Sequence, residues 1–166
     1  MYGFEPFGEY EKNISQDIIG NLQTETDTEQ IIFPVALERQ QFLRAMSDVQ
    51  PDIVLGLGQV DRGDTIRVER RAINMMKKNT AIRPQKILRS GPEHYHATLP
   101  IEKRKGLIQS YNAGLYVCNF SLYILLDFFR GSKTRVGFLH VPREIELAKA
   151  TAVISDILTE TRKIWG

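Results

Sequence analysis

Apolar residues recur every three or four positions in three stretches of the chain, the spacing that places them on one face of an α-helix. The first stretch can be capped by Asn13 or Ser15 and reaches about Leu22. The second covers residues 37–49 and the third residues 144–164. A nearly continuous apolar run follows Asn119, and we expect it to form a fourth helix that ends near residue 129.

Short apolar runs between these stretches predict β-strands. The clearest are residues 31–35, 52–59 and 136–142, which are rich in β-branched side chains. Residues 65–74 alternate between apolar and charged side chains, and residues 107–110 form a shorter run. A strand, a helix and a second strand in succession are the unit of a parallel sheet, so we predict an α/β fold. Its functional site should lie beyond the carboxyl ends of the strands.

Three segments carry neither pattern and are predicted to be loops. Residues 1–8 contain two glycines and one proline, which favour a fixed loop over a helix or a strand. In this loop Phe4 and Phe7 are either core residues or the lining of a pocket. Residues 23–30 are polar, and residues 75–90 are basic and irregular, as expected of a surface loop or a lid.

The composition fits one ordinary globular domain spanning residues 1–166, with 42% apolar and 25% charged residues. Twenty-two basic and twenty acidic residues leave a net charge of +2, which gives no reason to expect binding to nucleic acid. The N-terminus does not resemble a signal peptide, and the longest apolar stretch, residues 122–129, is too short to cross a bilayer. We therefore expect a soluble, cytoplasmic protein with no membrane partner.

Cys118 is the only cysteine, so it cannot form an internal disulfide bond. Ala113 and Gly114 allow a tight turn before it, and the predicted helix begins beside it. The N-terminus of a helix favours thiolate over thiol, and the thiolate is the nucleophilic form. Cys118 is thus a candidate nucleophile of a cysteine peptidase. Taken alone, it is more often a buried and inert small apolar residue.

Other polar residues near predicted strand ends have two interpretations each. Gln59 is a turn residue or an amide that binds a ligand, and His140 is a structural imidazole or a base. Glu69, on the alternating strand, would ordinarily be a surface carboxylate. All three fall where one α/β site could collect them. His94 and His96 have a spacing that could serve a metal, but no cysteine or carboxylate cluster accompanies them, and we expect no metal site there.

Six blocks of sequence, in order, resemble the pyroglutamyl peptidase I (pyrrolidone-carboxylate peptidase) family. The blocks are Gly3-Phe4-Glu5-Pro6-Phe7-Gly8, Gly58-Gln59, Val68-Glu69-Arg70 with Ala72 and Asn74, Ala97-Thr98-Leu99-Pro100, Ala113-Gly114 with Val117-Cys118-Asn119, and Gly137-Phe138 with His140-Val141-Pro142. The resemblance implies a three-layer α/β/α sandwich around a mostly parallel sheet. It also implies removal of an N-terminal pyroglutamyl residue from peptides, no metal or organic cofactor, and a homo-oligomer.

The resemblance assigns roles to individual residues. Cys118 matches the family's nucleophile, His140 its histidine base and Glu69 its acidic member. The residues that match those receiving the pyroglutamyl ring and its amide are Phe4, Phe7 and Gln59.

The sequence departs from the family pattern in three places. Only Met1 and Tyr2 precede the first glycine-rich block, so the family's first strand is expected to be missing. The family's arginine-containing motif, resembling Asp-Ala-Arg-Ile-Pro-Asp-Asn, is replaced by residues 75–80, although Arg83 is near. The family's helix before Ser110 is cut to about one turn.

Three functions therefore stay open on the sequence alone. The first is an active cysteine exopeptidase specific for pyroglutamyl peptides. The second is a non-catalytic relative that binds pyroglutamyl or other N-blocked peptides, or a protein partner. The third is a hydrolase of another amide or thioester at the same site. Retention of a thiol, an imidazole and a carboxylate favours the first, because a binding module gains nothing from that combination.

Overall fold

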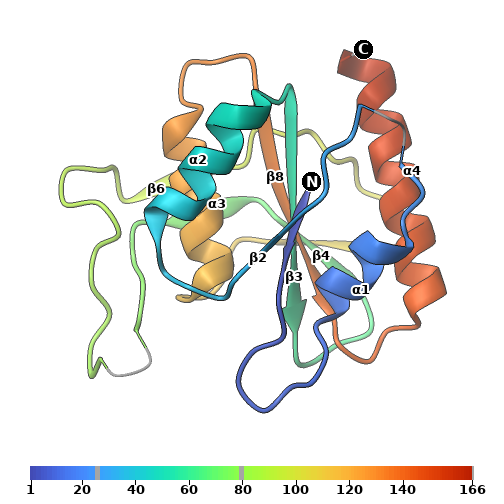
Figure 1. The fold of residues 1–166 in the computed structure, drawn as a ribbon, viewed down its shortest axis with the longest axis horizontal. Helices are drawn as coiled ribbons and strands as arrows, with labels where there is room; N and C mark the ends of the chain where they lie inside the picture. The colour runs from blue at the N-terminus through green and yellow to red at the C-terminus, as the bar shows by residue number, and fades with distance from the viewer. Residues whose placement is uncertain (25–26, 79–80, 166) are drawn as a thin grey trace.

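The computed structural model describes residues 1–24, 27–78 and 81–165. The described residues form four helices, and Figure 1 shows them in two layers on either side of a central sheet. The helices are α1 (Ile14–Asn21), α2 (Arg39–Val49), α3 (Val117–Phe128) and α4 (Leu147–Trp165). Helices α1 and α4 cover one face of the sheet, and α2 and α3 cover the other, as the three-layer prediction requires.

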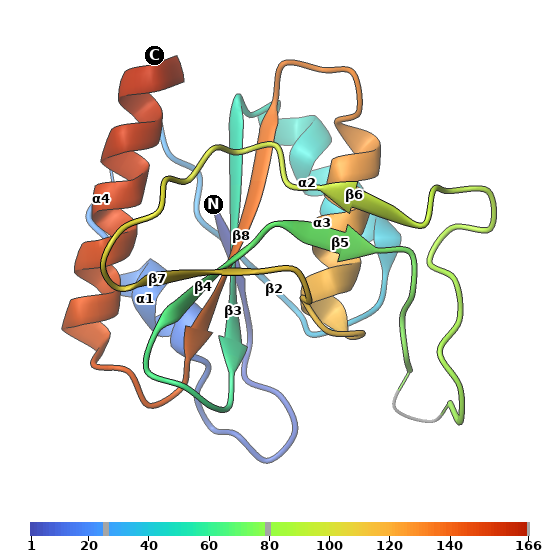
Figure 2. The same cartoon turned by 180° about the vertical axis from the view of Figure 1, so that it is seen from behind.

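The described part of the chain contains eight strands. They are β1 (Tyr2–Phe4), β2 (Ile31–Phe33), β3 (Ile53–Val60), β4 (Ile66–Glu69), β5 (Arg71–Ile73), β6 (His94–His96), β7 (Leu107–Ser110) and β8 (Arg135–Pro142). Six of them form the main sheet in the order β2-β1-β3-β8-β4-β7, and β5 pairs with β6 in a separate ribbon (Figure 2). The predicted helices and most predicted strands agree with these bounds to within three residues, and the α/β fold class is confirmed.

Strands β3 and β8 form the centre of the main sheet. They pair in parallel over eight positions, from Ile53 opposite Arg135 to Val60 opposite Pro142. Strands β1 and β2 continue the parallel arrangement on one side. On the other side β4 runs antiparallel to β8, and β7 runs parallel to β4. The sheet is therefore mostly parallel, with one reversal of direction at the joint between β8 and β4.

Alternating residues of β3 and β8 contribute to two separate apolar cores. Val136 and Phe138 pack in the core beneath α2 and α3, together with aromatic residues such as Tyr2 and Phe42. Leu139 and Val141 point to the opposite face and pack in the core beneath α1 and α4. Because successive residues of a strand point to opposite faces, His140 shares the α3 face with Phe138.

The first residues differ from the sequence prediction. The expectation that the family's first strand is missing stays a prediction. A loop was predicted for residues 1–8, but Tyr2–Phe4 form β1 between β2 and β3. This part of the prediction is wrong because the side chains of Tyr2 and Phe4 are almost completely buried, at 0% and 1% exposure. Their burial holds a three-residue strand in the middle of the sheet despite the neighbouring glycines.

The strand predicted over residues 65–74 is broken at Arg70. Its first half is β4, and its second half is β5, which leaves the main sheet to pair with β6. The Arg70 backbone marks the divergence, since its N–H donates to Ser110 O and its carbonyl accepts from Ala97 N. Strand β6 was not predicted, because its exposed histidines give no apolar alternation.

Parts of two predicted loops, at residues 25–26 and 79–80, lie outside the described residues. Residues 101–106, where the family's helix was expected to be shortened, contain no helix in the described structure. None of the described helices is both long enough and apolar enough to span a membrane.

Candidate active site

Three elements bring the candidate catalytic side chains to one place. His140 lies near the end of β8, directly opposite Gly58 of β3 and Arg67 of β4. Glu69 is two residues beyond Arg67 on β4, so it points to the same face of the sheet as His140. Cys118 enters from α3, which packs on that face. The structure therefore gathers all three residues on the α3 side of the sheet.

The imidazole of His140 is paired with the carboxylate of Glu69. The distance between His140 Nδ1 and Glu69 Oε1 is 2.8 Å, and the two residues are only 8% and 1% exposed. An Nδ1–H donated to the carboxylate fixes the tautomer and leaves Nε2 for the thiol. The pattern-based interpretation of Glu69 as a surface carboxylate is wrong, because β4 is enclosed between β8 and β7.

Cys118 is the second residue of α3, whose first backbone N–H groups have no partner within the helix. Its side chain is partly exposed. Opposite it lies Gly58, where an added Cβ would be only 2.6 Å from Cys118 Sγ. The absence of a side chain at Gly58 therefore leaves the space that the sulfur occupies.

A buried hydrogen-bond chain supports the first turn of α3. Tyr2 Oη donates to Ser121 Oγ at 3.0 Å, and Ser121 Oγ donates to the carbonyl of Cys118 at 3.0 Å. The neighbouring Asn119 is fully buried and hydrogen bonds to β5. The sequence analysis gave no role to Tyr2, Ser121 or the Asn119 side chain. Of the three, only Asn119 is in a block that matches the family, directly after Cys118.

Opposing influences set the protonation of His140. Burial lowers the pKa of the imidazole, but the adjacent Cys118 sulfur, followed by the Glu69 carboxylate, outweighs burial and raises the pKa to about 9. The raised pKa favours the protonated imidazole at neutral pH, and a positive charge beside a cysteine favours the nucleophilic form of its sulfur. An ion pair of this kind can attack a carbonyl carbon and then deliver a proton to the leaving group.

A cavity of about 240 Å³ opens beside Cys118 and His140. Its lining includes the three residues expected to receive the pyroglutamyl ring and its amide, which are Phe4, Phe7 and Gln59. Asn13, Val35 and the segment before the cysteine, residues 113–117, complete the lining. The lining is mostly apolar. Asn13 was expected only to cap α1, which it does by accepting from Ser15 N, and its place at the cavity was missed.

Gln59 offers a free donor at this cavity. Its Oε1 accepts from Ile14 N at 3.0 Å, which fixes the orientation of the amide. Its Nε2 is buried and has no hydrogen-bond partner among the residues that the structure describes. A buried donor without a partner is costly, and a carbonyl oxygen of a ligand would satisfy it.

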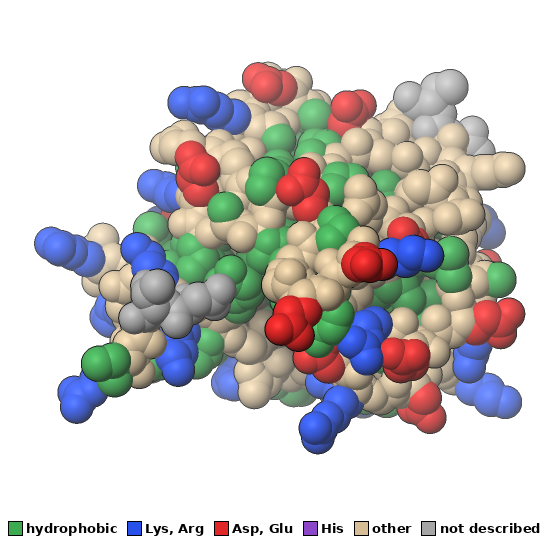
Figure 3. Space-filling view, turned by 60° about the horizontal axis from the view of Figure 1, so that its bottom comes forward, with side chains coloured by type: hydrophobic (Ala, Val, Ile, Leu, Met, Phe, Trp, Pro, Cys, Tyr) green, Lys and Arg blue, Asp and Glu red, His purple; other side chains and the backbone are tan. Residues whose placement is uncertain are grey.

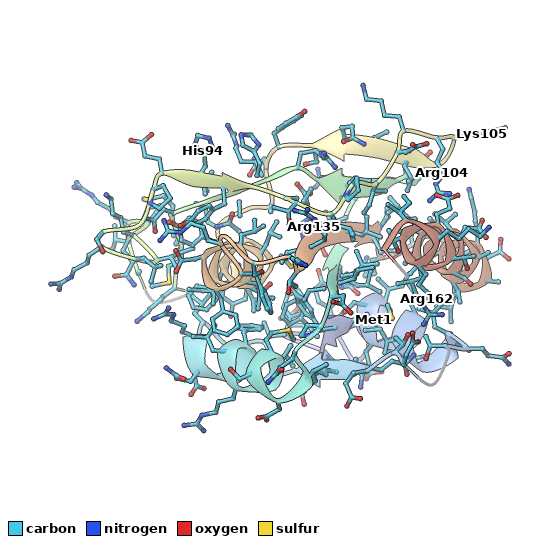
Figure 4. All side chains as sticks on the ribbon, turned by 90° about the horizontal axis from the view of Figure 1, so that it is seen from above. Met1, His94, Arg104, Lys105, Arg135 and Arg162 are labelled. Carbon is cyan, nitrogen blue, oxygen red and sulfur yellow. The ribbon has the colours of Figure 1, made fainter. Side chains whose placement is uncertain are left out.

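A larger hollow of about 410 Å³ lies at the other end of the sheet, at the start of β3. Met1 and Arg162 both line it, and Figure 4 shows them in the view from above. Cys118, His140 and Glu69 do not line it. We therefore place the candidate active site at the smaller cavity, where the nucleophile and the base are.

Two further expectations concern residues outside the cavity. Arg83, the arginine nearest to the family's missing motif, is exposed on the segment between β5 and β6. His94 and His96 are exposed on β6, with their ring centroids 5.1 Å apart. Within residues 1–24, 27–78 and 81–165, no group of three or more His, Cys, Asp or Glu side chains could hold a metal ion.

Comparisons with known proteins show the family of the chain. The model of the pyroglutamyl peptidase family matches residues 1–152. The chain is 35% identical over 161 residues to the pyrrolidone-carboxylate peptidase of Thermococcus onnurineus, covering 84% of this chain and 80% of the relative. It is 31% identical over 172 residues to that of Clavibacter michiganensis, covering 91% of this chain and 81% of the relative.

Solved structures show the same fold. The pyrrolidone carboxyl peptidase from Thermococcus litoralis superposes with a TM-score of 0.84 at 24% identity, covering 98% of this chain and 91% of that one. A mutant of the Pyrococcus furiosus protein gives a TM-score of 0.87 at 21% identity, covering 99% of this chain and 98% of that one.

Proposed function

Because the chain belongs to the pyroglutamyl peptidase family, we propose that it hydrolyses the amide bond after an N-terminal pyroglutamyl residue with Cys118 as nucleophile. His140 is the acid and base, and Glu69 orients and charges the imidazole. The observation that carries this assignment is the buried His140–Glu69 pair, 2.8 Å apart, beside the cysteine at the start of α3.

The reaction follows from these side chains. The Cys118 thiolate attacks the pyroglutamyl carbonyl carbon, and a tetrahedral intermediate forms. Protonated His140 gives its Nε2 proton to the departing amine as the C–N bond breaks, which leaves a thioester on Cys118. Neutral His140 then takes a proton from water, whose oxygen attacks the thioester carbonyl. Pyroglutamate leaves, and the proton returns the pair to thiolate and imidazolium.

The tetrahedral oxygen needs hydrogen-bond donors. The backbone N–H of Cys118 is in the first turn of α3, where helix geometry leaves the amide without an intrahelical partner. We assign it as the first donor of the oxyanion site, because its hydrogen bond strengthens as negative charge develops on the oxygen.

The pocket suits a pyroglutamyl ring. The ring is uncharged and largely apolar, and Phe4 and Phe7 supply apolar surface on one wall. We assign Gln59 Nε2 as the donor to the lactam carbonyl, because its amide is oriented by the bond of Oε1 to Ile14 N and its Nε2 is buried without a partner among the described residues. Only a few fixed hydrogen bonds are needed to orient a small ligand in such a cavity.

The test is release of a fluorescent amine from its pyroglutamyl amide under reducing conditions by the wild-type protein and by its Cys118→Ala and Cys118→Ser variants. We expect turnover by the wild type and a loss of about 1,000-fold or more in both variants, because the nucleophile is gone. A folded wild-type protein that binds pyroglutamyl peptides without turnover would instead support the binding-module function.

We further propose that the protein works in the cytoplasm, where reducing conditions keep the Cys118 thiol free. We also propose, from the family resemblance, that the protein forms a homo-oligomer. We expect it to bind no nucleic acid, because the charge of the chain is nearly balanced. Sedimentation of the purified protein under reducing conditions, with and without added RNA, would test both parts.

A further inference from the structure

The segment that joins β5 to β6, residues 75–91, projects from the body of the molecule, and we name it the arm. Figures 1 and 2 show it extending toward the same end as the tips of the β3 and β8 arrows. Met76 and Gln85 pair across it in an antiparallel bridge. At its base, the Asn74 side chain donates to Leu88 O and Gly91 O and accepts from Leu88 N. These hydrogen bonds therefore fix the conformation of the described part of the arm.

The root of the arm is bonded to the wall of the active-site cavity. Lys77 N donates to Leu115 O at 2.7 Å, and Leu115 lines the cavity. Asn119, the residue after the nucleophile, donates to Met75 O at 2.9 Å. A peptide that leaves the cavity across the Leu115 wall therefore passes the arm.

The arm carries a strong local positive charge. It contains five basic residues and no acidic residue, while the whole chain has a net charge of only +2. All five basic residues are exposed, and none forms an ion pair with another described residue. They are Lys77, Lys78, Arg83, Lys86 and Arg89.

The opposite side of the cavity differs in charge. The loop after β1 carries the exposed carboxylates Glu5, Glu9 and Glu11, with Lys12 beside them. In Figure 3, blue side chains lie at the left end of the face with green apolar side chains beside them, and red and blue side chains are mixed over the right-hand part. The stronger of the two fields is that of the arm, with five unpaired cations against three carboxylates and one lysine.

We propose that the arm binds acidic side chains in the residues that follow pyroglutamate, so that peptides with Asp or Glu in the leaving segment are preferred substrates. This inference rests on the proposed function, because it gives the substrate class of the same site. The attraction acts on the part of the peptide outside the cavity. It therefore changes KM and association more than the chemical step, and it weakens with salt.

The test compares pyroglutamyl-Ala-Glu-Glu-Ala with pyroglutamyl-Ala-Gln-Gln-Ala and pyroglutamyl-Ala-Lys-Lys-Ala, which have equal length and similar shape. We expect kcat/KM for the Glu peptide to exceed that for the Gln peptide by roughly threefold to tenfold at low salt, as for a few exposed ion pairs. The Lys peptide should be the poorest substrate, and 0.5 M NaCl should remove most of the difference. Equal kcat/KM for the Glu and Gln peptides, or a preference for Lys, would overturn the proposal.

A charge-reversed arm, K78E/R83E/K86E, provides the second comparison. It should lose or invert the preference for the Glu peptide while its turnover of a small uncharged pyroglutamyl amide stays within about twofold of wild type. The control is K103E/K105E, which reverses two exposed charges in the loop before β7. Figure 4 shows Lys105 at the opposite end of the molecule from His94, which follows the arm. The control should keep the preference, and an arm variant that also kept it would contradict the proposal.

Failure of the proposed function would be seen separately. If the wild type turned over no pyroglutamyl substrate, the preference can still be measured as binding of the labelled Glu and Gln peptides to the Cys118→Ala variant by fluorescence anisotropy. Tighter binding of the Glu peptide that disappears in the arm variant would support the role of the arm, and equal binding would reject it.

Discussion

At the scale of single residues, the protonation of His140 depends on its two neighbours. Burial alone would favour the neutral imidazole, and the sulfur of Cys118 and the carboxylate of Glu69 reverse that preference. Because both neighbours raise the pKa of His140, removing either one should lower that pKa. Mutations at positions 69 and 118 can be compared directly on this basis.

We expect Glu69→Gln to reduce kcat/KM by about 100-fold or more, because an amide cannot stabilise the imidazolium and allows the wrong tautomer. The variant should also have a lower His140 pKa, measurable from the pH dependence of the imidazole NMR signals. Glu160→Gln, a surface change on α4, is the control and should leave both quantities unchanged. A Glu69→Gln enzyme with wild-type turnover would contradict the assignment of Glu69.

A pH dependence follows from the pKa of about 9. The folded-state pKa of His140 is raised above the ordinary value of 6.5. Protonation of His140 thus stabilises the fold below about pH 6.5, and this contribution is lost as the pH rises through about 9. Activity should also fall above about pH 9, as the general acid loses its proton. Chemical denaturation and kcat/KM, both measured from pH 6 to 10, test this, and His140→Gln should lack the stability change.

Gly58 gives the sharpest steric prediction. A methyl group there would be 2.6 Å from Cys118 Sγ and 2.8 Å from Phe138 Cζ. We expect Gly58→Ala to move the sulfur and to reduce kcat/KM by about 100-fold, since small displacements of reacting atoms are costly. The control is Gly20→Ala, in the exposed last turn of α1, where nothing lies within 4 Å of the new methyl group. It should keep activity and raise the free energy of unfolding by about 0.5–1 kcal/mol.

At the scale of elements, the Asn119 side chain joins the helix of the nucleophile to the strand that follows Glu69. Its Oδ1 accepts from Ile73 N, and its Nδ2 donates to Ile73 O and Met75 O. Asn119→Ala would remove the side-chain partner of these partly buried backbone groups of Ile73 and Met75. We expect a loss of about 2–4 kcal/mol in the free energy of unfolding.

Asn119→Asp keeps the bond from Ile73 N but loses both donors and adds a buried charge, so it should be at least as harmful. If Asn119 also positions Cys118, kcat measured well below the unfolding temperature should fall while KM changes little. Unchanged kcat in a folded variant would limit the role of Asn119 to stability.

The sequence predicted elements where the signal is local. The apolar period of residues 37–49 and the β-branched run of residues 52–59 are both properties of a few consecutive residues, and the corresponding α2 and β3 form as expected. Strand β1 was missed because glycine and proline suggested a loop, while the burial of Tyr2 comes from distant partners.

The candidate site was predictable only in part. The family blocks identified the residues that meet at the cavity, but the burial of Glu69 depends on its pairing with β8 and β7 and has no local signal. The hydrogen bonds of Asn119 and the attachment of the arm to Leu115 likewise join segments that are far apart in the chain.

At the scale of the whole molecule, the two apolar cores have different relations to the site. Phe138 belongs to the core beneath α2 and α3, and its ring lies 5.2 Å from that of His140. Ile154 belongs to the core beneath α1 and α4. Phe138→Ala and Ile154→Ala should each reduce the free energy of unfolding by about 2–5 kcal/mol.

Only one of these variants should impair the enzyme under conditions where both are folded. Phe138→Ala removes the packing beside His140 and should lower kcat/KM by 10-fold or more, whereas Ile154→Ala should stay within about twofold of wild type. Thermal unfolding and turnover of the pyroglutamyl amide, measured on the same samples, separate the two effects. Equal losses of turnover would show that the cores are not independent.

The reversal of strand direction at β4 has a further consequence for water. Strand β4 is antiparallel to β8, so it runs from the carboxyl end of β8 toward the interior of the sheet. Glu69, the last residue of β4, therefore lies beside Phe138 and not beside the last residues of β8. A strand running the other way would bring its final carboxylate to the rim, where solvent would compete for its oxygens. The direction of one short strand thus sets the depth of the acid, and His140 has a carboxylate partner that bulk water does not reach.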